Sequence, residues 1–194
     1  MFAIIVGALS VLSLAVSVID IGMNICKALG MFDKDMSAEE LGDRALQAQE
    51  KGIKLADYKD NFDEYVKEIE TIDLDPEISE KYDLAEKNKA AANVLGTGIV
   101  EHYGKDSGVD KFLHDEVTES NKDFYTPERA VAYMDTFKNS GENMDNINKY
   151  FDNKLDSLQD IRQVDEKLVE AEKKLGVDED TAKQNLDTEK AKRG

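Results

Sequence analysis

The positions of apolar and polar side chains divide the chain into two parts of different character. Residues 2–19 form a run of 18 residues that contains no charged side chain. A helix of that length covers about 27 Å at about 1.5 Å per residue, and the hydrocarbon core of a bilayer is about 30 Å thick. The pattern therefore predicts an N-terminal apolar helix that spans a membrane or is buried in an assembly of chains.

A line of small and polar side chains runs along one face of this apolar helix, because its members are spaced three or four residues apart. This helix-association seam consists of Gly7, Ser10, Ser13, Ser17, Asp20 and Asn24. Hydroxyl, amide and carboxylate groups cost free energy in lipid unless they find partners, and small residues let a second helix approach closely. We therefore expect the seam to pair with another copy or with a partner helix. A plain membrane anchor and a narrow polar pore are the alternatives.

The residues that flank the apolar run bear on its location. A cleaved secretory signal is disfavoured, because no Lys or Arg precedes the run and no small-x-small cleavage site follows it. The nearest positive charges, Lys27 and Lys34, follow the run, which places the rest of the chain in the cytoplasm under the positive-inside rule. We expect a single-pass membrane protein, with a secreted, extracellular assembly as the alternative.

The remainder of the chain shows helical periodicity and no convincing strand pattern. The apolar spacing predicts helices over 38–71, from 76 to about 99, over 109–117, from 127 to about 138 and over 142–175, with the first of them loosened at Gly52. Three start signals support these helices, namely Ser37 with Glu40, Asp75 with Pro76, and Thr126 with Pro127. Paired glycines at 96 and 98 are expected to end or bend the second helix, and Gly141 is expected in a turn.

The last long helix carries the regular spacing of three and four residues that is typical of a coiled coil. This coiled-coil seam consists of Leu158, Ile161, Val164, Leu168, Ala171 and Leu175. The predicted fold is therefore all-α, with an apolar N-terminal helix followed by an elongated, acidic helical bundle of coiled-coil-like character. We divide the chain into an apolar helix (1–32), an acidic helical domain (33–180) and a charged C-terminal tail (181–194).

Charge is distributed as unevenly as hydropathy. The sequence has 42 Asp and Glu against 25 Lys and Arg, a net charge of -17. Residues 1–32 contain only Asp20 and Lys27, which cancel, so the whole net charge lies on residues 33–194. The acid excess argues against a nucleic-acid partner, because phosphate binding needs a basic surface.

Residues that carry chemistry are sparse in this sequence. The two histidines, His102 and His114, lack the spacing of metal ligands, and the single cysteine, Cys26, cannot form an intramolecular disulfide. No nucleophile elbow, phosphate loop or dinucleotide-binding fingerprint is present. We expect a protein without catalytic residues, metal or cofactor.

Together these patterns predict a non-enzymatic structural or interaction protein. Its expected partners are membrane lipid or further copies of itself, which would make it a homo-oligomer, and other proteins bound through helical faces. In its order of elements the chain resembles subunits of type III secretion filaments, with the parallel lying in an apolar N-terminal helix (2–32), a middle region and a C-terminal helix (142–175). The resemblance lies in architecture alone. It implies the alternative function, a secreted self-assembling subunit that forms a filament or a pore in a bacterial secretion or toxin system.

Overall fold

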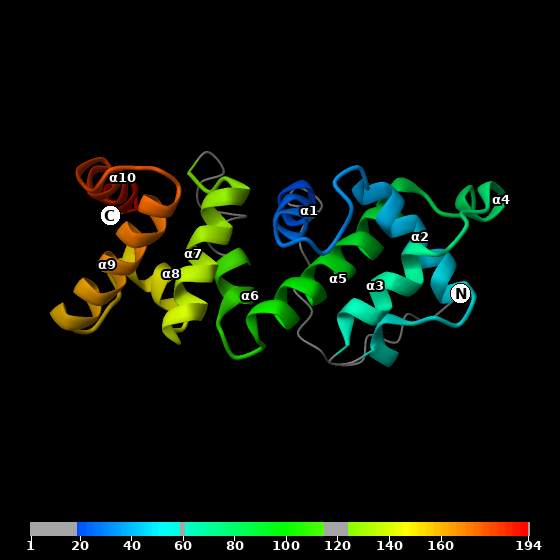
Figure 1. Cartoon of the computed structure of the whole chain (residues 1–194), viewed down its shortest axis with the longest axis horizontal. Helices are drawn as coiled ribbons and strands as arrows, with labels where there is room; N and C mark the ends of the chain where they lie inside the picture. Colours follow the sequence, from blue (N-terminus) through cyan, green and yellow to red (C-terminus); the bar gives the residue numbers. More distant parts are fainter. Residues whose placement is uncertain (1–18, 59–60, 115–123, 194) are drawn as a thin grey trace. The chain divides into compact units, whose positions relative to one another are not determined.

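A computed structural model describes residues 19–58, 61–114 and 124–193 of the chain (Figure 1). These residues form ten α-helices and one 3₁₀ helix, and none of them lies in a strand, which confirms the all-α prediction. The chain divides into two compact units, unit 1 (Met1–Glu101) and unit 2 (His102–Gly194). The division falls within one helix, α5 (Leu84–Tyr103).

The division into units follows contacts between helices, whereas the predicted regions 1–32, 33–180 and 181–194 follow charge and hydropathy. Those regions stay a prediction about the properties of the chain. Residues 181–194 fall largely within α10 (Glu179–Ala191), which buries Ala182 and Leu186.

Unit 1 is built around α5, together with α1 (Ile19–Ala28), α2 (Ala38–Glu50), α3 (Phe62–Glu70), α4 (Pro76–Ser79) and the 3₁₀ helix η2 (Leu55–Tyr58). Its core contains the fully buried side chains of Ile25, Leu41, Ile69, Leu95 and Ile99. The backbones of α2 and α5 approach closely at Gly42, where a Cβ atom would lie 1.9 Å from the carbonyl oxygen of Lys87. Glycine is therefore required at this crossing.

Unit 2 contains α6 (Val109–Phe112), α7 (Pro127–Ser140), α8 (Asp145–Phe151), α9 (Leu158–Lys174) and α10. Aromatic rings fill its core, where edge-to-face pairs gain attraction beyond their buried area. The fully buried rings are those of Phe112, Tyr125, Tyr133, Phe137 and Phe151.

The single helix that we predicted over 38–71 is wrong. The structure ends α2 at Glu50, and Gly52 follows with a φ of +88°. The N–H of Ile53 donates to the carbonyl of Ala48, which closes the last turn in the manner of a glycine C-cap. The chain then passes through η2 to α3. Apolar spacing continues across this break, so periodicity alone does not detect it.

The predicted helix over 142–175 is also interrupted. Helix α8 ends at Phe151, and Asn153 adopts a φ of +56°. Helix α9 then begins after Ser157, whose hydroxyl accepts from the N–H of Asp160 at 3.0 Å. The asparagine and the capping serine are the local signals of a break that the apolar pattern concealed.

Glycines 96 and 98 do not end the second helix where we expected, because α5 continues to Tyr103. A Cβ atom at Gly98 would lie 2.6 Å from the ring of Phe62. This glycine therefore serves close packing of α3 against α5 and not termination.

The predicted helix starts are confirmed, but the helix predicted from 76 to about 99 is interrupted, because α4 ends at Ser79 and α5 begins at Leu84. The side chains of Ser37, Asp75 and Thr126 accept hydrogen bonds from the N–H groups of Glu40, Glu77 and Arg129, respectively. The turn at Gly141 is confirmed as well, with a φ of +71° after the end of α7.

Within residues 19–58, 61–114 and 124–193, no helix combines the length and the apolar character needed to cross a bilayer. Most of the apolar run, residues 2–18, lies outside these ranges. Its membrane-spanning character therefore stays a prediction.

Candidate functional site

Helix α1 contains the only part of the helix-association seam that lies among the described residues. Asp20 and Asn24 are exposed on one side of α1. Ile19, Met23 and Cys26 are buried on the other, at 3%, 4% and 0% exposure. Helix α1 is thus amphipathic, with its apolar side packed inside unit 1 and its seam side directed to solvent.

The remaining seam residues, Gly7, Ser10, Ser13 and Ser17, lie outside the described residues. The structure therefore does not test whether the seam is continuous, and the seam as a whole stays a prediction. The C-terminal end of the seam, at Asp20 and Asn24, presents a carboxylate and an amide on the exposed side of a folded helix.

Cys26 occupies the buried side of α1, where its thiol lies 3.9 Å from the carbonyl oxygen of Leu95. Burial raises the pKa of the Cys26 thiol well above its usual range. A buried, protonated thiol is a poor nucleophile, so Cys26 behaves as a small packed side chain.

The coiled-coil seam divides into buried and exposed positions along α9. Val164, Leu168 and Ala171 are buried within unit 2, at 1%, 0% and 0% exposure. Ile161 is half-buried, while Leu158 and Leu175, at the two ends, are 75% and 39% exposed. The middle of the seam therefore belongs to the core of unit 2, and coiled-coil pairing stays a prediction.

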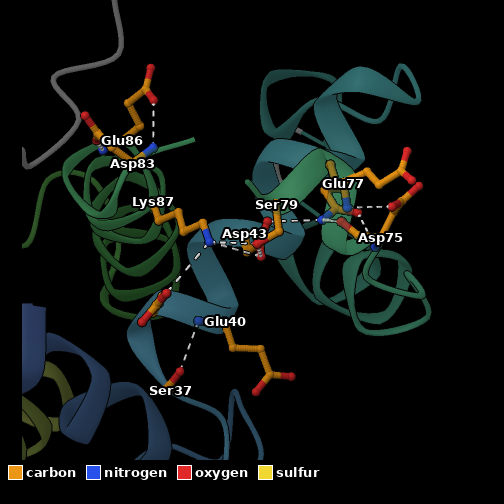
Figure 2. Close-up of polar contacts among 11 residues, drawn as sticks. Ser37, Glu40, Asp43, Asp75, Glu77, Ser79, Asp83, Glu86 and Lys87 are labelled. Atoms are coloured by element: carbon orange, nitrogen blue, oxygen red, sulfur yellow. Dashed lines mark hydrogen bonds and ion pairs between the residues drawn. The ribbon is translucent and has the colours of Figure 1, made fainter. Parts of the chain in front are cut away.

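A buried polar cluster that periodicity did not predict links three helices of unit 1 (Figure 2). Lys87 extends from α5 toward α2, where its Nζ lies 3.4 Å from Oδ2 of Asp43 and 2.7 Å from the hydroxyl oxygen of Ser79. The Ser79 hydroxyl donates to the same Asp43 oxygen at 2.5 Å. We call Asp43, Ser79 and Lys87 the Asp43 cluster.

The Asp43 cluster depends on the close crossing at Gly42. Because Gly42 has no side chain, the α2 backbone contacts the α5 backbone at Lys87, and the neighbouring Asp43 comes within reach of the Lys87 ammonium group. Asp43 and Lys87 are 5% and 8% exposed, and Glu39 supplies Lys87 with a second carboxylate at 3.7 Å. A buried charge is tolerated only with such partners.

Unit 2 contains a second cluster of the same kind, formed by Arg129, Tyr133 and Glu172 and called here the Glu172 cluster. The Glu172 carboxylate is fully buried. Arg129 donates to it through Nε at 2.7 Å and Nη2 at 3.1 Å, and the Tyr133 hydroxyl donates at 2.7 Å. Burial, together with the Glu172 charge, raises the pKa of Tyr133 well above its usual range. The cluster therefore joins α7 to α9.

The two clusters satisfy their charges internally, as structural ion pairs do. The described residues contain no group of three or more His, Cys, Asp or Glu side chains placed to hold a metal ion. Periodicity missed both clusters because it scores Asp43, Lys87 and Glu172 as surface positions. No local signal marks these positions as buried, because their partners lie far away along the chain, 43 residues away for Glu172.

Comparisons of the chain with protein-family models, with curated proteins and with solved structures find no match.

Proposed function

We propose that the protein is a non-enzymatic interaction protein whose N-terminal apolar segment holds an acidic helical body at a membrane. The observation that carries this proposal is the separation of hydropathy from charge. Residues 2–19 carry no charge, whereas the net charge of -17 lies entirely on residues 33–194. An apolar run of this length is stable in lipid, and a strongly acidic body is repelled by anionic headgroups and stands away from the surface.

The packing of α1 supports the proposal. Ile19, the last residue of the apolar run, and Met23, four residues later, are buried inside unit 1. The segment is therefore joined to a folded unit without an intervening linker. Such a junction restricts the motion of the acidic body relative to the anchor more than a flexible linker would.

The exposed side of α1 supports pairing between copies. Asp20 and Asn24 lie four residues apart on that side, and both can hydrogen-bond to a partner helix. We therefore propose that the anchored protein forms a homo-oligomer through the helix-association seam.

Membrane retention of the full chain tests the anchor. We expect the chain to remain with membranes after a carbonate wash and to float with liposomes. Leu12→Arg should release it, because a charge near the centre of a spanning helix costs about 2.5–3.5 kcal/mol. Leu158→Arg is the matched control, since Leu158 is already 75% exposed on α9 and a charge there should not change retention.

Purification of the full chain as a monomer in buffer without detergent would contradict the anchor. Large assemblies in the same buffer would instead favour the alternative, a secreted self-assembling subunit.

Cross-linking of the full chain in liposomes tests the seam. Asp20→Ala combined with Asn24→Ala should reduce cross-linked oligomers while the protein stays with the membrane. Unchanged cross-linking in this variant would argue against pairing through the seam.

A further inference from the structure

The segment between α3 and α5 is attached to the rest of unit 1 through polar contacts and has no buried side chain of its own. This segment, residues 73–83, is called here the strap and includes the four-residue helix α4. Leu74, Ile78, Ser79 and Tyr82 are only half-buried. The strap carries five carboxylates and one lysine, a net charge of -4. In Figure 1 its helix α4 lies at the edge of unit 1.

Both ends of the strap are fixed. At its start, the Arg44 guanidinium of α2 donates to the carbonyl oxygens of Glu70 at 2.9 Å and Ile72 at 2.8 Å. At its end, Asp83 and Glu86 form a reciprocal capping pair that begins α5. Ile72, directly before the strap, is buried, and so is Lys87, four residues after its end. The strap is therefore a bounded segment, and its ends stay in place whatever its middle does.

The middle of the strap is attached to α2 through polar contacts. The Gln47 side chain accepts from the Asp75 N–H at 2.9 Å and donates to the Asp75 carbonyl at 3.2 Å. Ser79 joins the Asp43 cluster, as Figure 2 shows, and the Tyr82 hydroxyl donates to Glu50 at 2.7 Å. These contacts close the strap over Gln47, which is 0% exposed.

The rest of unit 1 does not need the strap to stay folded. Asp43 and Lys87 belong to α2 and α5, so their ion pair persists when Ser79 moves away. The apolar core of α2, α3 and α5 contains no strap residue. Segments with few buried apolar contacts open at lower free energy than the core around them.

Repulsion between the acidic residues of the strap and those of α2 opposes closure of the strap on α2. The strap's net charge of -4 lies against α2, which carries four carboxylates and one cation, Arg44, and therefore has a net charge of -3. Repulsion between exposed charges is screened by salt, whereas the buried Asp43–Lys87 pair is screened much less. From these observations we propose that the strap opens and closes on α2 while the rest of unit 1 stays folded, and that rising ionic strength favours the closed state. Opening uncovers Gln47 and Asp43.

Native-state hydrogen exchange of the full chain tests whether the strap opens independently of the rest of unit 1. The Asp75 amide reports the strap directly, and the amides of Leu95 and Ile99 report the core. We expect the strap to exchange faster than the core. Gln47→Ala should accelerate strap exchange about tenfold, the effect of losing a hydrogen bond or two. Because Gln47 also donates to Asp43 at 3.1 Å, we expect a smaller acceleration at the core amides. Gln49→Ala, an exposed glutamine on the same helix, is the matched control and should change neither.

Ser79→Ala provides a second variant, since it removes one contact from the strap itself. It should accelerate strap exchange in the same way. Trypsin should cut the full chain after Lys81, in the strap, before Lys67, which is exposed on α3. Raising sodium chloride from about 20 mM to about 500 mM should slow strap exchange roughly threefold, the size of a few screened surface interactions.

Equal exchange rates in the strap and the core would overturn the proposal, as would equal acceleration of the strap and core amides by Ser79→Ala. Faster strap exchange at high salt would overturn the role of ionic strength.

Discussion

Each unit of the protein holds helices together with a buried carboxylate, but the two clusters are built differently. Glu172 in unit 2 is 0% exposed and receives two hydrogen bonds from one guanidinium group, that of Arg129. Asp43 in unit 1 is 5% exposed and meets a lysine at 3.4 Å, with a serine hydroxyl between them. A guanidinium fork matches a carboxylate in fixed geometry, whereas an ammonium group is a point charge that changes partners easily.

The two clusters connect different parts of their units. The Glu172 cluster joins two core helices, α7 and α9, and the Arg129 guanidinium also packs over the Phe124 ring with 4.4 Å to its centroid. The Asp43 cluster joins α2 and α5 to a strap on the surface. Rigid pairing therefore lies in the core of unit 2, and exchangeable pairing lies where a segment of unit 1 can detach.

Arg129→Ala should have the largest effect, because it leaves the fully buried Glu172 carboxylate without its cation. We expect unit 2 to lose about 3–5 kcal/mol of unfolding free energy. Urea-dependent hydrogen exchange of the full chain, read at core amides of unit 2, measures the loss. Arg162→Ala, at an exposed position of α9, is the control and should stay within about 0.5 kcal/mol. A loss below about 1 kcal/mol in Arg129→Ala would mean that the Glu172 cluster is no more rigid than the Asp43 cluster.

Gly42→Ala should come next, because the new methyl group meets the Lys87 backbone and forces α2 away from α5. We expect a loss of about 3 kcal/mol in unit 1, typical of an overpacked contact. The same exchange measurement on unit 1 amides tests this. Gln49→Ala on the exposed side of α2 is the control, and equal stability of the two variants would show that the crossing is not close.

Asp43→Asn measures how strongly the Asp43 cluster depends on its buried charge. It removes the charge that faces Lys87 but keeps the shape of the side chain. Lys87 retains Ser79 and Glu39 as partners, so we expect a loss of only about 1–2 kcal/mol in unit 1. A loss as large as that of Arg129→Ala would break the proposed distinction between the two clusters.

The substitution Asp145→Asn should have the smallest effect, and it concerns the stability of unit 2 at acid pH. Burial opposes its ionisation, but ion pairs with Lys111 at 2.5 Å and Lys149 at 3.1 Å outweigh burial and lower its pKa. Because the pKa of Asp145 is lower in the folded chain, the Asp145 carboxylate stabilises unit 2 at pH values above its unfolded-state pKa of about 3.9. This stabilisation is lost as the pH falls through the folded-state pKa. Asp145→Asn should therefore destabilise unit 2 by less than about 1 kcal/mol at pH 7 and flatten the decline of its stability below about pH 4. An unchanged acid decline in the variant, measured by urea unfolding across pH, would contradict the assignment.

Local signals in the sequence predicted the helical fold and several of its boundaries. Ser37, Asp75 and Thr126 start helices as predicted, because a capping side chain bonds to a backbone group only two or three residues away. Breaks were harder to predict. Gly52 and Asn153 end helices by adopting a positive φ, and apolar spacing continues past both residues.

Contacts between distant parts of the chain were not predictable from pattern. Gly98 resembles a helix terminator in the sequence, yet the Phe62 ring makes it a packing position inside α5. Asp43 and Glu172 resemble solvent-exposed acids until the helices that supply their partners are in place. The exposed end of the helix-association seam, at Asp20 and Asn24, was placed on one face by spacing alone.

The sequence by itself determined the all-α character, the helix starts and the separation of an apolar segment from an acidic body, because these depend on propensity, capping and composition along a short stretch of chain. Tertiary structure determined which charges are buried and which segment remains detachable. A charge can be buried only beside a partner, and the partner of Glu172 lies 43 residues away in sequence. Only the packing of helices brings such groups together.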